Sequence, residues 1–400
     1  MAGAAAIVLA LAAAWSVAGW FLWESRVPDG LDLPSLDAEA VFGKAQLAAA
    51  DDYERFHRIS FLLETVVTLA AFAIYARKGA RFARESAAGR IGTGMLLAML
   101  GFALVWLVQL PFAIAGLWWD RRHDVAEYGY FELIFGGWLE LGVAFVFLCL
   151  SVLIVMGLAG PLPRLWWAPA SAAFVGVATL FAFVFPYTVL DTRPLDDPEL
   201  VAAAERFARA EGVEDVPIVV EDVDAYTSAA NAYAAGLGPS RKVFLWNTLL
   251  DGRFDDGEVE MVIAHEFAHH ARDHLWKSLA WYALFAVPGT FLIAIATRRR
   301  GGVRDPAAMP LAIFVLVALA LAATPLQNVI SRHMEAEADW GALETTRDPE
   351  SARKLFVSFA ETSLGDPTPP GWAYVLLDSH PTLLDRVAMA EAWRESHRSG

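Results

Sequence analysis

The sequence predicts a mainly helical membrane protein in which seven transmembrane helices carry a small α+β domain at the membrane surface. The chain of 400 residues is 56% hydrophobic and only 19% charged, whereas a soluble domain carries about 25% charged residues. Several apolar runs reach the roughly 20 residues that a helix needs to cross a bilayer. A long polar stretch, at residues 191–277, separates two of these runs.

Seven segments have the length and apolar character of a spanning helix. The first lacks a basic leader and is longer than the core of a signal peptide, so we interpret it as a retained span. The third contains Pro111, and we expect its helix to end near there. The segments are residues 3–23, 59–75, 93–119, 134–158, 165–190, 278–297 and 308–329.

We expect four parts along the chain. Residues 1–190 form five membrane helices with short loops, and residues 191–277 form a polar segment of helices and strands. Residues 278–329 form the sixth and seventh membrane helices, and residues 330–400 begin with an acidic helix and complete the polar domain. The lone cysteine, Cys149, excludes an intramolecular disulfide and a thiolate metal cluster.

The polar segment carries local signals for its elements. Asp197 and the proline after it predict the start of an amphipathic helix, and Gly212 predicts its end. Residues 216–220 and 242–246 are β-prone, with residues 231–237 between them. Asp255, followed three residues later by a glutamate, resembles a capping box, which predicts that another helix begins near residue 257.

This last helix carries the most informative motif of the chain, His265-Glu266-Phe267-Ala268-His269. Residues four apart share a helical face, so both histidines can bind one metal ion. The glutamate lies beside the open position of such a metal, where a base would meet a bound water. The motif therefore predicts a catalytic zinc site.

A catalytic zinc site needs a third protein ligand, and the acidic helix after the seventh span offers one. Glu335 and Asp339 are four residues apart and share a face. We expect Glu335 to bind one zinc ion per chain together with His265 and His269, and Asp339 to accept a hydrogen bond from a ligating imidazole. Glu337 is expected to point away from the metal.

The string HEFAHH, followed much later by SRHMEAEAD, resembles the type I CAAX prenyl protease family and its bacterial relatives, the heat-shock membrane metalloproteases. The stretch Asn231-Ala232-Tyr233 resembles the family's substrate-edge segment, and the stretch from His380 to Arg386 resembles its C-terminal SHPxxxxR segment. The resemblance implies a zincin-like domain in which the edge segment and Arg386 bind substrate and His380 assists the tetrahedral intermediate.

The sequence departs from the family pattern at three positions. Ala268 replaces a glycine, His270 an aromatic residue and Thr382 a frequent proline. None of these changes removes an expected ligand. We interpret His270 and His274 as structural, because both lie off the predicted metal face.

The resemblance implies a zinc-dependent endopeptidase that cleaves peptide or membrane-protein substrates in the lipid bilayer, including prenylated CAAX-type substrates. Two other functions stay open, a metalloprotease-like signal transducer and a transporter with a non-catalytic metal site. Glu64 and Glu140, within predicted spans, would suit a transporter or the water-filled chamber that the resemblance implies. The net charge of −15 argues against a nucleic-acid partner.

The side of the membrane that the metal site faces is left open. Of the basic residues in loops, six lie in longer loops on one side. Ten lie in short loops on the other side, such as the one with Arg77, Lys78 and Arg81 and the one with Arg299 and Arg300. The positive-inside rule makes this side cytoplasmic and puts the metal site on the other side, whereas the resemblance implies a cytoplasmic site. Frequent alanine and arginine favour a bacterial genome and hence the bacterial cytoplasmic membrane.

Overall fold

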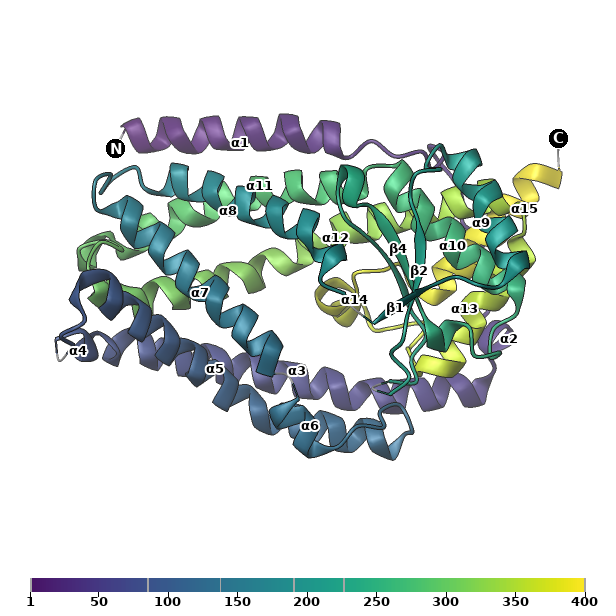
Figure 1. The fold of residues 1–400 in the computed structure, drawn as a ribbon, viewed down its shortest axis with the longest axis horizontal. Helices are drawn as coiled ribbons and strands as arrows, with labels where there is room; N and C mark the ends of the chain where they lie inside the picture. The colour runs from purple at the N-terminus through teal and green to yellow at the C-terminus, as the bar shows by residue number, and fades with distance from the viewer. Residues whose placement is uncertain (1, 85, 137, 190, 226, 399–400) are drawn as a thin grey trace.

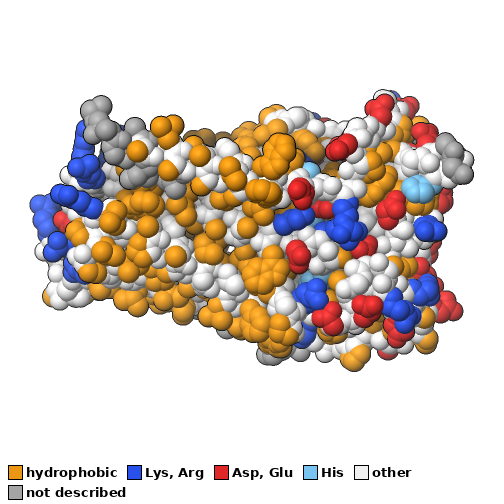
Figure 2. All heavy atoms as spheres, turned by 90° about the horizontal axis from the view of Figure 1, so that it is seen from above, with side chains coloured by type: hydrophobic (Ala, Val, Ile, Leu, Met, Phe, Trp, Pro, Cys, Tyr) orange, Lys and Arg blue, Asp and Glu red, His pale blue; other side chains and the backbone are white. Residues whose placement is uncertain are grey.

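Long helices form one end of the molecule, and a small sheet with shorter helices forms the other (Figure 1). The computed structural model describes residues 2–84, 86–136, 138–189, 191–225 and 227–398. Hydrophobic side chains cover the helical end in Figure 2, and charged side chains gather over the end with the sheet. The charge distribution thus separates a membrane part from a polar part.

Six of the described helices are long and apolar enough to cross a membrane. The first helix, α1 (Ala2–Leu22), coincides with the first predicted span, but its described apolar part, Ala12–Leu22, is shorter, so the count of seven spans stays a prediction. The six are α3 (Lys44–Lys78), α5 (Gly89–Arg122), α7 (Trp138–Ala159), α8 (Trp167–Val184), α11 (His274–Thr297) and α12 (Met309–Thr346).

Two of these helices continue where the sequence suggested an end. The expected end near Pro111 is wrong, because α5 runs through it to Arg122; within a bilayer, neighbouring helices can satisfy the carbonyl that proline leaves unpaired. The seventh predicted span and the acidic helix are one helix, α12, with Pro325 in its interior. Glu64 is half-buried on α3, and the side chain of Glu140 lies outside the described part.

The sheet contains four strands in the order β1-β2-β4-β3. Antiparallel pairing joins β3 to β4, with Tyr233 opposite Phe244, while β2 and β4 are parallel. Since β3 is the last strand in this order, one of its edges has no partner strand among the described residues. The strands are β1 (Thr192–Pro194), β2 (Ile218–Glu221), β3 (Ala232–Ala235) and β4 (Lys242–Trp246).

Local sequence signals set the ends of the two helices beside the sheet. The side chain of Asp197 caps α9 (Pro198–Glu211), which Gly212 ends in the left-handed conformation at φ 70°. In α10 (Asp256–Ala271), the Asp255 carboxylate accepts the N–H of Glu258, whose side chain accepts the N–H of Asp255. The predicted capping box is therefore present, and it anchors the first turn of the helix with the HExxH motif.

Short helices complete the polar end and the loops. Of the C-terminal three, α14 and α15 pack against α12, whereas α13 packs against α10 and α15. Their bounds, with those of the other short helices, are α2 (Ala38–Phe42), α4 (Ala80–Ala83), α6 (Tyr130–Phe135), α13 (Pro349–Ser363), α14 (Gly371–Leu377) and α15 (Leu383–Arg398).

Small residues allow α10 and α12 to cross closely. A Cβ atom placed on Gly341 would lie 3.0 Å from the Cβ of Ala268. Ala268 is fully buried at this crossing, next to the buried Phe267. The alanine that departs from the family pattern therefore faces α12, and the glycine opposite leaves room for its methyl group.

We predict that Gly341→Val destabilises the protein by about 1–3 kcal/mol, because the added side chain overpacks this crossing. Thermal unfolding of the detergent-purified protein should show a lower midpoint. Gly176→Val, on α8, is the control, since a Cβ there meets nothing within 4 Å. Equal midpoints for the two variants would contradict the close crossing.

Candidate active site

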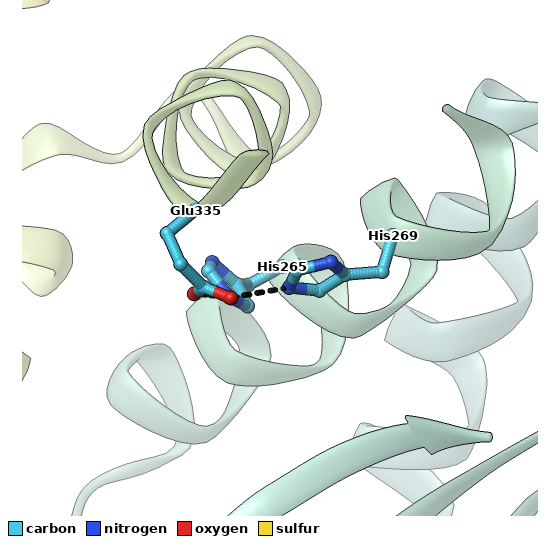
Figure 3. A group of neighbouring side chains, drawn as sticks. All are labelled: His265, His269 and Glu335. Carbon is cyan, nitrogen blue, oxygen red and sulfur yellow. Dashed lines mark hydrogen bonds and ion pairs between the residues drawn. The ribbon is translucent and has the colours of Figure 1, made fainter. Parts of the chain in front are cut away.

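Three side chains from α10 and α12 converge on one point (Figure 3). His265 and His269 lie one turn apart on α10, and their Nε2 atoms are 3.0 Å apart. Glu335 reaches them from α12: its Oε2 lies 3.3 Å from Nε2 of His265, and its Oε1 lies 3.6 Å from Nε2 of His269. Their side chains are between 12% and 15% exposed, so the three ligand candidates are largely buried.

These residues fit a metal ion. Each offers one ligand atom, and the three atoms lie within 4.8 Å of one another. The buried Oε2 of Glu335 makes no hydrogen bond in the described part of the chain. Burial lowers the pKa of His269 to about 3, so its imidazole is neutral and carries a lone pair. Two imidazoles, one carboxylate and an open side are the donor set of catalytic zinc.

Asp339 contacts the nitrogen of His265 that does not face the triad. Its Oδ1 lies 2.9 Å from Nδ1 of His265, where the sequence predicted a contact between Asp339 and a ligating imidazole. Burial alone would lower the pKa of His265, but Asp339 and Glu335 raise it to about 10. A metal ion must displace this proton, so metal binding to the site depends on pH.

Arg386 lies on the other side of Asp339. Its Nε and Nη2 donate to the two carboxylate oxygens at 2.8 and 2.6 Å. Its guanidinium also stacks over the ring of Phe356, 4.2 Å from the ring centre. We predicted Arg386 to be a substrate-binding residue; the structure gives it a positioning contact while it also lines the cavity described below.

Glu266 lies between the metal triad and the sheet. Its side chain is 7% exposed, and burial raises its pKa to about 7, an effect that the backbone amide of Ala234 in β3 partly opposes. A base with a pKa near the working pH is the most effective proton acceptor. The position and the pKa both suit a general base.

His380, expected at the site only from the resemblance, lies in the loop between α14 and α15. Its Nε2 is 3.2 Å from Oε2 of Glu335. Arg332 fixes this loop by donating to the carbonyl oxygens of Tyr374 at 2.9 Å and Asp378 at 2.5 Å. The loop therefore brings a third imidazole next to the metal triad.

A cavity of about 450 Å³ joins these residues to the free edge of β3. Asn231, Ala232 and Tyr233 all line it. The Tyr233 hydroxyl donates to Glu221 at 2.9 Å and the ring stacks on Phe244, so this side chain supports the sheet. The backbone N–H of Ala234 in β3 donates to Glu266, and the side chain of the exposed Asn231 accepts the N–H of Ala232 at 2.9 Å.

His274 and Glu337 lie near the metal site, where the sequence did not predict them. The Nδ1 of His274 lies 2.8 Å from the Nδ1 of His269, and its Nε2 lies 3.0 Å from Oε2 of Glu337. The sequence predicts a structural role for His274, because it lies off the predicted metal face. Asp273, left-handed at φ 54°, lies between the end of α10 and the start of α11, and this turn brings His274 back towards the site. No sequence pattern predicts the contact between His274 and His269, because it depends on the left-handed backbone of this turn.

This chain is similar to known proteins in sequence and in fold. The family model described as peptidase family M48 matches residues 194–394. An uncharacterized metalloprotease, YhfN, of Bacillus subtilis is 24% identical over 93% of this chain and 92% of its own length. A CAAX prenyl protease 1 homolog of Oryza sativa is 24% identical over 60% of this chain and 59% of its own length.

A protease HtpX homolog of Acaryochloris marina is 28% identical over 49% of this chain and 72% of its own length. The crystal structure of S. mikatae Ste24p matches with a TM-score of 0.71 at 19% identity, over 95% of this chain and 96% of that one. The family model begins at the last residue of β1 and covers the other three strands, the HExxH helix, α12 and the C-terminal helices up to residue 394. The chain therefore belongs to peptidase family M48, and it is a metalloprotease with membrane-spanning helices.

Proposed function

We propose that this protein is a zinc-dependent integral membrane endopeptidase that cleaves peptide bonds of membrane-associated substrates. The observation that carries the proposal is the shared cavity: the metal triad, the buried Glu266 and the free edge of β3 all line it. An extended peptide on that edge would pass directly over the metal and the base.

Zinc held by His265, His269 and Glu335 would activate a water and polarise the substrate carbonyl. Glu266 takes the proton from the attacking water and passes it to the leaving amine. His380, on the open side of the triad, donates a hydrogen bond to the developing oxyanion.

The site lies close to the membrane. Only Arg272 and Asp273 separate α10 from α11, and α12 supplies a ligand from its continuation beyond the bilayer. A substrate held in the membrane can therefore reach the cavity. Prenylated CAAX-type chains are one class that we propose, supported by the name of the rice relative. Membrane proteins are a second class of substrate that we propose. Substrates of either class would present an extended segment near the bilayer.

We predict one zinc ion per chain, bound by the triad. His265→Ala and Glu335→Ala should each lose it, because two ligands no longer complete a catalytic site. Elemental analysis of the purified protein measures the zinc content. His270→Ala is the matched control, since His270 is buried on the same helix and contacts the Lys242 carbonyl instead. A full equivalent of zinc in both ligand variants would contradict the assignment.

We predict that Glu266→Gln retains zinc but cleaves casein or a prenylated peptide at least about 100-fold more slowly, since a general base is lost and no ligand is. Zinc content and cleavage rate are measured on the same preparation. A near wild-type rate would remove Glu266 from the mechanism.

We predict that the β3 edge binds substrate through its backbone. Ala232→Pro should lower turnover strongly, because it removes a backbone N–H and restricts Asn231. Asn231→Ala should lower turnover more mildly while zinc content stays unchanged. Tyr233→Phe is the control, since it removes only the hydrogen bond to Glu221. If cleavage is unchanged in the first two variants, substrate enters over another surface.

A further inference from the structure

We propose that His274 and Glu337 form a positioning relay that orients the metal ligand His269, as Asp339 and Arg386 orient His265. The inference rests on the proposed zinc site and assigns roles to two residues outside the ligand set. Neither residue needs to touch the metal or the substrate.

The hydrogen bonds define one consistent set of tautomers. His269 presents Nε2 to the triad, so its Nδ1 carries the proton and donates to Nδ1 of His274 at 2.8 Å. His274 therefore carries its own proton on Nε2 and donates it to Glu337 at 3.0 Å. A ligating histidine whose second nitrogen is bonded in this way keeps its ring orientation and its tautomer.

Glu337 is itself held firmly. Lys277 donates to its Oε2 at 3.1 Å, and the backbone N–H of Arg26 donates to its Oε1 at 3.0 Å. The side chain is 3% exposed, and a buried carboxylate is stable only when paired and hydrogen-bonded. The relay therefore ends on a fixed charge, anchored by α11 and by the segment that follows α1.

The helix period explains why α12 serves both histidines. Asp339 lies one turn beyond Glu335 and shares its face towards α10. Glu337, two residues from each, lies on another face and meets His274 at the start of α11. One helix thus supplies a metal ligand and the carboxylates that orient the other two ligands.

The alternative is that His274 and Glu337 only join α11 to α12. The affinity for zinc distinguishes the relay from this alternative, because a purely structural hydrogen bond stabilises the protein whether or not zinc is bound. The informative measurements on the full-length protein in detergent are the zinc dissociation constant, by competition with a chelator, and the unfolding midpoint of the metal-free form.

We expect His274→Leu to weaken zinc binding by about 10–100-fold. His274→Asn should lose less, since its side-chain oxygen can accept the same hydrogen bond from His269. Glu337→Gln, which keeps the shape of the side chain, should also weaken binding. Adding Glu337→Gln to His274→Leu should have little further effect, because residues that act through one chain are not additive.

The control is His270→Leu, which removes a buried histidine of α10 that contacts no ligand. The relay is wrong if His274→Leu and Glu337→Gln keep the wild-type zinc dissociation constant. It is equally wrong if His270→Leu weakens zinc as much, or if only the midpoint of the metal-free form falls. Absence of zinc from the wild-type protein would instead refute the proposed function, and with it the relay.

Discussion

The metal site depends on the close crossing of α10 and α12, two helices that are far apart in the sequence. Ala268 and Gly341 meet at this crossing, and larger side chains there would separate the helices. Two ligands come from one helix and the third from the other, so a shift of the crossing by a fraction of an ångström changes the distances between the ligand atoms. The small residues are thus as necessary to the site as its ligands.

Burial of charge is the second constraint. The side chains of Asp339, Glu337 and Glu335 are all at most 12% exposed. Asp339 pairs with Arg386, and Glu337 with Lys277, so these two carry little uncompensated charge. Glu335 has histidines around it but no Lys or Arg partner in the described ion pairs. A bound metal ion would balance this charge in place of the proton that His265 otherwise carries, so the donor set suits a metal.

The long apolar helices also supply or hold residues of the metal site. Because α12 is continuous from its apolar half to Glu335, the ligand lies at a fixed distance along the helix from the apolar half. The start of α11 carries His274, and the segment after α1 donates a backbone N–H to Glu337. Three membrane-associated elements thus meet behind the metal ligands, and the sheet edge faces them across the cavity.

The sequence by itself determined the features that depend on neighbouring residues. The caps of α9 and α10 followed from Asp197, Gly212 and Asp255, because capping involves residues within one turn. The spacing of His265 and His269 followed from the helical period. The apolar runs indicated most membrane helices, since length and hydropathy suffice for a span.

Only the tertiary structure decided how distant segments meet. The contacts of Arg386 with Asp339 and of His274 with Glu337 join elements that no local pattern relates. In a soluble protein, proline usually ends a helix. The helix α5 nevertheless continues past Pro111, because packing against neighbouring helices and the absence of water outweigh this preference. The position of β3 at the sheet edge likewise depends on which strands pair, and strand pairing is decided by the whole fold.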